Sequence, residues 1–189
     1  MQTLQIEIPV EAAVAALLKK LSQAQTPGTM QSPPPAGQYW PEQGGVYAGI
    51  VRGEDGQADH YLIVSTSPAG YCESVTWGGY ETNEPGARHE RDGLANTVSL
   101  CDSDTDHPAA QWAAALEIDG HSDWYLPARR ELRLLWINVP ELFAEGWYWS
   151  STQFSPDDAW GQVFDGGSQS YGHKCGFGRA RAVRRLSVI

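Results

Sequence analysis

The sequence predicts an α+β domain preceded by a short helical appendage. Three observations lead to this fold class: strand-like segments follow each other at residues 44–65, helix-like segments occupy residues 108–136, and glycine-rich strand-like segments fill residues 148–185. Strands grouped before and after helices, instead of alternating with them, are typical of the α+β class. We therefore expect two helices with short antiparallel sheets and long loops.

Length and composition set the outer limits of the interpretation. The chain has 189 residues, 41% of them hydrophobic, and a formal net charge of −10. One globular domain with an appendage fits this length, and the apolar content argues against global disorder. The acidic balance argues against a nucleic-acid-binding protein and against attraction to anionic membranes. The start of the chain lacks a signal-peptide pattern and no run approaches the ~20 apolar residues of a membrane helix, so we expect cytoplasmic synthesis without membrane insertion.

The first 38 residues are expected to precede the globular domain. Residues 4–8 alternate as a short strand does, and residues 10–25 form an alanine-rich helix with Val10, Val14, Leu17 and Leu21 on one stripe. This helix either packs on its own domain or makes residues 1–26 an oligomerisation element. Residues 27–38 contain three consecutive prolines, which neither continue a helix nor pair as a central strand. We interpret residues 27–38 as a linker and residues 39–189 as the domain.

The domain is expected to begin with a β-hairpin. Its strands are residues 44–52 and 60–65, separated by a segment of turn composition. Residues 77–96 are polar and glycine-rich without a clear period, and we interpret them as a long surface loop. Asp102, Asp104 and Asp106 then alternate as in a calcium loop, but His107 and Ala113 stand where an EF-hand needs glycine and glutamate. We expect an acidic turn that caps the next helix, and no metal site.

Two helices are predicted in the middle of the chain. Residues 108–116 are alanine-rich, with Trp112 and Leu116 four residues apart on one face. Residues 128–136 place Leu132, Leu135 and Trp136 on one apolar face.

The cysteines are an odd set without Cys-x-x-Cys spacing: Cys72, Cys101 and Cys175. Free thiols are favoured in a chain without a secretion signal. A disulfide between Cys72 and Cys101 is the alternative.

The chain is organised around residues 148–185. Two rigid blocks, residues 148–152 and 181–185, enclose a segment rich in glycine, serine, glutamine and aromatic residues. Such a mixture buries little apolar area, so a core does not require it. It is the composition of loops that contact a ligand.

The motifs in and before this stretch resemble one protein family. The Tyr-Trp-Ser-Ser-Thr block at residues 148–152, Asp-Trp-Tyr-Leu-Pro at residues 123–127, Glu131-Leu132 and the terminal Arg-Ala-Val-Arg at residues 181–184 resemble the Lcl C-terminal domain family of bacteria and phages. They look especially like its members that serve as variable proteins of diversity-generating retroelements. The resemblance implies a C-type-lectin-like fold and a ligand-binding role for residues 39–189. This chain has Tyr125 where the family usually has arginine, and Ala182 where typical members have a disulfide-forming cysteine.

The resemblance also implies which residues vary and which hold the fold. Phe154, Tyr171 and Phe177 are expected to be the main anchors, because interface energy concentrates in aromatic residues; the alternative for Phe177 is a core position. The scaffold is expected to bury Trp124, Trp149, Trp160, Phe164 and Val183. The variable, ligand-contacting residues are expected to be Phe154, Ser155, Asp157, Asp158, Gln162, Asp165, Ser168, Ser170, Tyr171, His173, Cys175 and Phe177.

Ligand binding is favoured over catalysis. The five histidines are scattered, and no metal-pair spacing, nucleophile elbow or phosphate loop is present. We expect no catalytic residue and no cofactor, and a partner that is a protein or cell-surface receptor, met from a virion or cell surface. One alternative is a fixed carbohydrate-binding domain, but Asn83-Glu84-Pro85 matches the calcium-binding Glu-Pro-Asn motif of such lectins only in part. The other alternative is a structural phage tail component.

Overall fold

The structure is a computed structural model, and it describes residues 32–53 and 56–188. The chain divides into two units, Met1–Pro33 and Pro34–Ile189, and the second is described below. The predicted strand at residues 4–8, the predicted helix at residues 10–25 and the first part of the predicted linker lie outside the described residues and stay predictions.

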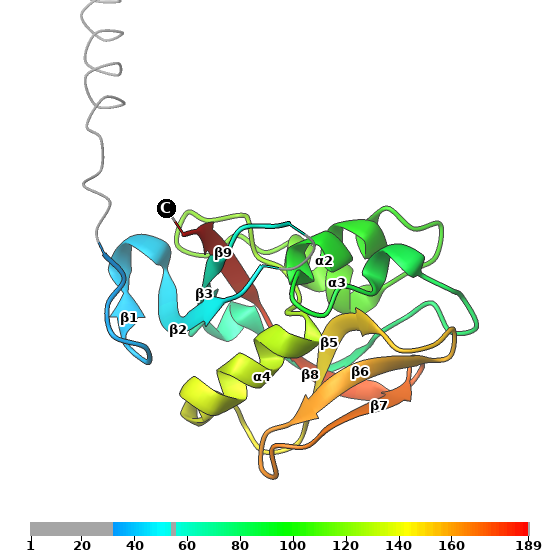
Figure 1. The fold of residues 1–189 in the computed structure, drawn as a ribbon. Coiled ribbons are helices and arrows are strands. Elements are labelled where there is room, and N and C mark those ends of the chain that lie inside the picture. Colours follow the sequence, from blue (N-terminus) through cyan, green and yellow to red (C-terminus); the bar gives the residue numbers. More distant parts are fainter. Residues whose placement is uncertain (1–31, 54–55, 189) are drawn as a thin grey trace, which may run out of the picture. The chain divides into compact units, whose positions relative to one another are not determined.

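The domain contains two β-sheets, which lie side by side in Figure 1. The first sheet has four antiparallel strands in the order β1-β2-β3-β9. The predicted hairpin is confirmed, because β2 pairs with β3 and a β-bulge follows Tyr47. The last strand of the chain adds to the other edge of β3, so the two ends of the domain share this sheet. The strands are Tyr39–Trp40 (β1), Gly45–Val51 (β2), His60–Val64 (β3) and Val183–Ser187 (β9).

The second sheet has five strands in the order β4-β8-β5-β6-β7. Its pairs are antiparallel except for β5 and β8, which run parallel. The hairpin of β6 and β7 forms one edge of this sheet, at the lower right in Figure 1. The strands are Tyr71–Thr76 (β4), Trp147–Gln153 (β5), Asp158–Val163 (β6), Gln169–His173 (β7) and Phe177–Arg181 (β8).

In the described part of the domain, three α-helices lie between β4 and β5, where the sequence predicted two. They are Gly93–Cys101 (α2), Pro108–Ala114 (α3) and Arg129–Asn138 (α4). The helix α2 was missed, and part of it was wrongly assigned to a long loop. Its buried face carries the polar residues Asn96 and Thr97, which hide the apolar period. The expectation that acidic side chains cap α3 is also wrong: His107 occupies the N-cap without a side-chain hydrogen bond, and Pro108 begins the helix.

The short connections contain 3₁₀ turns, each of which starts with proline. A proline at the first position fits because its fixed φ suits the turn and its missing N–H is not needed there. The turns are Pro41–Gln43, Pro68–Gly70, Pro85–Ala87 and Pro140–Leu142.

The main core lies between the first sheet, α4 and the start of β5. Leu62, Leu132 and Tyr148 are fully buried there. Phe143 and Phe164 stack with ring centroids 3.8 Å apart, and both contact Tyr148 edge-on. Offset and edge-to-face pairs of this kind add to the burial of apolar area. The mixed arrangement of helices and sheets confirms the α+β class.

Candidate functional site

The segment with the Asp-Trp-Tyr-Leu-Pro motif is part of the scaffold. Arg184 on β9 makes two hydrogen bonds to Asp123, with Nε–Oδ1 at 2.8 Å and Nη2–Oδ2 at 2.9 Å. Its Nη1 also donates to the side chain and the carbonyl oxygen of Gln43. A planar guanidinium bound on two sides fixes orientation as well as distance. The motif therefore fastens the middle of the chain to its last strand.

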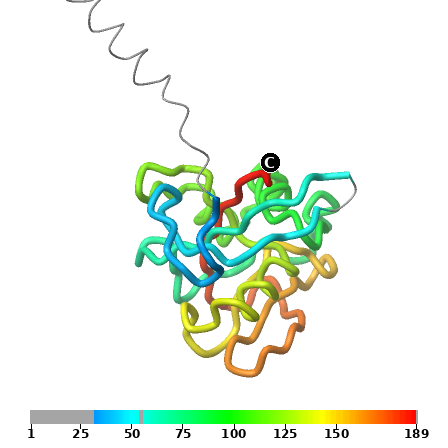
Figure 2. Tube along the Cα trace, turned by 60° about the vertical axis from the view of Figure 1, so that its left-hand side comes forward, coloured from blue at the N-terminus to red at the C-terminus, as the bar shows by residue number. Residues whose placement is uncertain are grey.

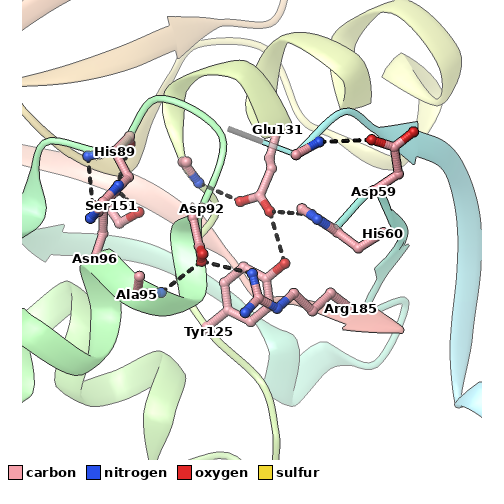
Figure 3. A network of polar contacts seen from close by, with 12 residues as sticks. Asp59, His60, His89, Asp92, Ala95, Asn96, Tyr125, Glu131, Ser151 and Arg185 are labelled. Carbon is pink, nitrogen blue, oxygen red and sulfur yellow. Dashed lines mark hydrogen bonds and ion pairs between the residues drawn. The ribbon is translucent and has the colours of Figure 1, made fainter. Parts of the chain in front are cut away.

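Glu131 is the centre of a buried polar network, which Figure 3 shows from close by. Its Oε1 accepts hydrogen bonds from His60 Nε2 at 3.0 Å and from the hydroxyl of Tyr125 at 2.9 Å. Its Oε2 accepts from the backbone N–H of Ala128 at 2.6 Å, which satisfies a free amide at the start of α4. Burial, followed by the neighbouring Glu131 charge, raises the pKa of Tyr125 well above its ordinary value, so Tyr125 stays a neutral donor. Tyr125 thus supplies a buried, neutral hydrogen-bond donor to this glutamate.

A second part of the network holds the start of α2. Asp92 accepts from the backbone N–H of Ala95 at 2.8 Å and from Arg185 Nη1 at 2.8 Å. Burial raises the pKa of Asp92, but the amide hydrogen bond and the guanidinium outweigh burial and bring it below its ordinary value. Asn96 exchanges two hydrogen bonds with the backbone of His89, at 3.0 and 2.7 Å (Figure 3). The charged groups of this network are bonded to one another, so it serves to brace the fold.

Exposed aromatic side chains gather on one face of the β6–β7 hairpin. Phe154 and Tyr171 stack with centroids 4.0 Å apart, and Trp160 meets both edge-on at 5.2 and 5.8 Å. Phe154 is 43% exposed and Tyr171 50% exposed, while Trp160 is half-buried. We call Phe154, Trp160 and Tyr171 the aromatic platform. Large aromatic rings that are left about half in water are typical of a binding surface.

The platform is held from one side by Arg129, the first residue of α4. Its guanidinium lies 3.7 Å from the centroid of a Trp160 ring. Arg129 also pairs with Glu90 at 2.9 Å and donates to Gln169 Oε1 on β7 at 3.3 Å. A cation over an indole face is attractive and also fixes the ring. The sequence contains no signal that marks Arg129 for this place.

Acidic and aromatic side chains adjoin the platform at the open end of the hairpin. Tyr80, 45% exposed, lies 6.1 Å from the ring of His173, and His173 Nδ1 lies 3.8 Å from Asp158 Oδ1. The charge of Asp157, followed by partial burial, raises the pKa of Tyr80. We call Tyr80, Asp157, Asp158 and His173 the acidic corner, and the platform with this corner the contact face. Sequence reasoning missed Tyr80, although an aromatic residue in a glycine-rich polar segment could have pointed to it.

The structure brings only part of the predicted contact residues together. Strand pairing places Trp160 opposite Tyr171 and Asp158 opposite His173, while Ser155 lies in the turn before β6. Cys175 is exposed in the turn after β7, at the same end of the hairpin. The other exposed candidates lie away from this face: Asp165 and Ser168 at the far turn of the hairpin, Ser170 on the opposite side of β7, and Phe177 on β8, 75% exposed.

Two assignments made from the sequence are corrected by burial. Gln162 was expected to contact a ligand, but it is fully buried and donates to the carbonyl oxygens of Val163 and Ser168 at 3.1 and 3.2 Å. Trp160 was expected in the interior, but it is half-buried on the contact face. Both side chains lie on the same side of β6, and α4 packs against this strand. The other scaffold candidates, Trp124, Trp149, Phe164 and Val183, are buried.

The remaining sequence candidates do not form a site. The Glu84 carboxylate points inward and accepts from His107 Nε2 at 3.0 Å and from Ser103 Oγ at 2.8 Å. In the part of the chain that the structure describes, no three His, Cys, Asp or Glu side chains come together as a metal site. Cys72, Cys101 and Cys175 are free thiols. Within residues 32–53 and 56–188, no helix has the length and apolar character to cross a membrane.

A protein-family model matches most of the domain. The sequence model of the Lcl C-terminal domain family matches residues 71–184. This range covers α2 to α4, all strands of the second sheet and the contact face. No curated protein matches the chain.

Proposed function

The chain belongs to the Lcl C-terminal domain family, and we propose that it is a non-enzymatic protein that binds a ligand through its contact face. The aromatic platform carries this proposal. Three large rings pack together beside the β6–β7 hairpin at the edge of the second sheet, and two of them, Phe154 and Tyr171, are about half exposed. Aromatic anchors surrounded by small polar residues are the composition of loops that bind proteins.

The ligand is a protein or a cell-surface receptor, and the contact face is variable between copies of the gene. Phe154, Tyr171 and His173 are exposed and contact one another or polar neighbours, so their replacement removes little core packing. That property is what a retroelement variable protein of C-type-lectin-like fold requires, and it supports this assignment. The protein would then act from a virion or a cell surface.

The alternatives have less support from the described residues. A calcium-dependent lectin would need the Glu84 carboxylate for an ion, but this group is 7% exposed and is bonded to His107 and Ser103. A catalytic role for Glu131 and His60 would need access to a substrate, but both side chains are almost fully buried and bonded to each other. A structural tail component remains compatible with the same face.

The proposal is tested first in the flanking DNA. A near-copy of the coding segment for residues 148–185, differing chiefly at adenines, is expected close to the gene. A genome without such a copy would remove the retroelement assignment and leave fixed ligand binding.

A library of displayed variants tests the face itself. Phe154, Ser155, Asp157, Tyr171 and His173 are randomised together, and the folded fraction is measured as resistance to protease. Most clones are expected to fold, and selection on one immobilised globular protein is expected to yield specific binders.

The matched control library randomises five interior positions. We choose Trp124, Tyr148, Trp149, Phe164 and Val183, all of them buried. Few of these clones are expected to fold, because large-to-small changes in a core cost about 2–5 kcal/mol each. Equal survival of the two libraries would contradict the division into scaffold and contact face.

A further inference from the structure

Lys174 is the one lysine among the described residues, and it is fully buried. The chain has three lysines, Lys19, Lys20 and Lys174. Lys174 follows directly after β7 and is 0% exposed. Lysine is almost never fully buried unless its charge is paired. The position therefore calls for a physical reason.

The ammonium group of Lys174 is surrounded by carbonyl oxygens. Its Nζ donates to Thr82 O at 2.7 Å, to Gln153 Oε1 at 2.8 Å and to Gly79 O at 3.2 Å. It also lies 4.7 Å from the ring centroid of Trp77, which is attractive for a cation. Several neutral oxygens around one positive charge are the environment that proteins give to hard metal ions. Here the charge is covalently attached to the chain.

These contacts join segments that are distant in sequence. Thr82 and Gly79 belong to the turn at residues 79–82, and Gln153 ends β5 directly before Phe154. The backbone of Lys174 makes two further hydrogen bonds. Its N–H donates to Asp157 O at 2.9 Å, and its carbonyl oxygen accepts from Gly78 N–H at 3.1 Å. Lys174 thus connects the 79–82 turn to both turns at the open end of the hairpin.

The turn held in this way carries Tyr80. Tyr80 directly follows Gly79 and precedes Thr82 by two residues. Its ring lies beside His173 on the contact face, with 6.1 Å between the ring centroids. The backbone of the turn has its own bond from Thr82 N–H to Gly79 O at 3.1 Å. That bond closes the turn but does not attach it to the rest of the molecule. Gly78 N–H and Glu84 N–H attach the flanks of the turn to Lys174 O and to Gln153 Oε1, and among the described residues the ammonium of Lys174 is the donor that attaches the turn itself, through Thr82 O and Gly79 O.

The charge on Lys174 is costly, which argues that its position has a use. Burial lowers the pKa of Lys174 to about 8, although the charges of Glu84, Asp157 and Asp158 oppose this shift. Arg88 adds a smaller effect in the same direction as burial. An apolar side chain of similar length would avoid the cost of desolvation. It would leave the carbonyl oxygens of Gly79 and Thr82 without this donor, so that the turn would be held through its flanks alone.

We infer that Lys174 is a positioning residue of the contact face: its ammonium group takes the place of a bound cation and holds the 79–82 turn so that Tyr80 stands beside His173. Lys174 itself is covered and does not touch a ligand. The inference rests on the proposed function for the meaning of the contact face, but the geometry of the turn is tested without any ligand.

The first test is backbone hydrogen exchange in Lys174→Met. Methionine keeps an unbranched stem against Trp77 and removes the three donors. Exchange at the hydrogen-bonded amides of residues 79–84, those of Thr82 and Glu84, is expected to become about ten- to hundredfold faster, the factor that corresponds to a lost hydrogen bond to a charged group. Exchange in α4 and the urea midpoint should change little. Unchanged exchange at residues 79–84, or equal acceleration throughout the domain, would overturn the inference.

The matched control removes one positive charge elsewhere. Arg130 is half-exposed and pairs with Glu90 at 2.9 Å, away from the 79–82 turn. Arg130→Met is expected to leave exchange at residues 79–84 unchanged. Acceleration as large as in Lys174→Met would mean that net charge, not the local bonds, controls the turn, and would overturn the inference.

A titration gives the spectroscopic signature of the site. In protein with ¹³C- and ¹⁵N-labelled lysine, the Lys174 signal is expected to titrate near pH 8, because its pKa is lowered from 10.5 to about 8. The unfolded chain then binds more protons than the folded chain between these values, so stability relative to Lys174→Met rises from pH 8 towards 10.5. A Lys174 midpoint at the ordinary value would place the amine in water and contradict the site.

The route through Tyr80 is tested with a clone selected from the displayed library and its immobilised target. Tyr80→Ala and Lys174→Met are expected to weaken this binding by similar factors, and the double variant should be no worse than either alone. Additive losses would overturn the assignment of Lys174 as acting through Tyr80. If no clone binds, the proposed function fails while the exchange and titration results still decide the role of Lys174.

Discussion

Two tyrosines provide the sharpest test of the division between scaffold and contact face. Tyr148 is fully buried, with its ring 5.0–5.1 Å from those of Phe164 and Phe143. Its replacement by alanine is expected to cost about 3–5 kcal/mol, the range for large aromatic side chains in cores. Tyr171 is 50% exposed, so it buries roughly 100 Å², or about 2.5 kcal/mol at ~25 cal/mol per Å². We expect Tyr171→Ala to cost about 1–2 kcal/mol, because an exposed site relaxes after truncation.

The assay is urea denaturation followed by circular dichroism, with the slope of the transition fixed for all variants. In thermal melts the same differences correspond to about 2–4 °C per kcal/mol for a domain of this size. The urea midpoint of Tyr148→Ala should therefore fall far below that of Tyr171→Ala. If Tyr171→Ala loses as much stability as Tyr148→Ala, the platform is part of the core and the reasoning behind the contact face is refuted.

Three further predictions concern the scaffold. Glu131→Ala should lower the free energy of unfolding by about 3–5 kcal/mol, because the buried donors around it lose their charged acceptor, and Tyr125→Phe should lower it by about 1.5–3 kcal/mol. Urea denaturation that ranks the two variants the other way would contradict the network. Gly161→Ala should lower the free energy of unfolding by at least about 1–3 kcal/mol, because the new Cβ would overlap an indole ring, whereas Gly166→Ala has open space around it and should change this free energy by no more than about 0.5 kcal/mol. Equal melting temperatures of the two variants would disprove this difference. Above pH 10, stability should fall less steeply in Tyr125→Phe than in the unchanged protein, because only the unfolded state releases the Tyr125 proton there; identical alkaline denaturation curves would count against the raised pKa.

The elements that could be predicted from the sequence are those whose buried face is apolar. The β2–β3 hairpin and α4 show the expected apolar faces, whereas α3 is present but ends at Ala114, before Leu116, and buries Ala109, Ala110 and Ala113. The helix α2 could not be predicted in this way, because Asn96 bonds the backbone of His89 and Thr97 bonds that of Leu126. Polar residues there are buried without cost only because distant segments supply their partners.

The contact face could be located in the chain but not resolved residue by residue. Composition pointed to the segment between β5 and β9, and Phe154 and Tyr171 do lie exposed in contact with each other. Trp160 was predicted to be buried and Gln162 to contact a ligand, whereas Gln162 is buried and Trp160 lies on the contact face. Residue type alone does not tell which end of β6 is covered. Lys174 was missed because its three acceptors are carbonyl oxygens, which any residue or amide can supply.

The strand order of the first sheet has a practical consequence. Both ends of the domain enter this sheet, β1 at Tyr39 and β9 at Ser187, whereas the hairpin with Tyr171 is the edge of the other sheet. In the tube of Figure 2 the C-terminal end and the first described residues lie at the top, and the β6–β7 hairpin at the bottom. A biosensor chip or bead coupled through a C-terminal tag would therefore hold the domain through its first sheet. The aromatic rings beside the β6–β7 hairpin would remain free to bind analyte in the flowing buffer.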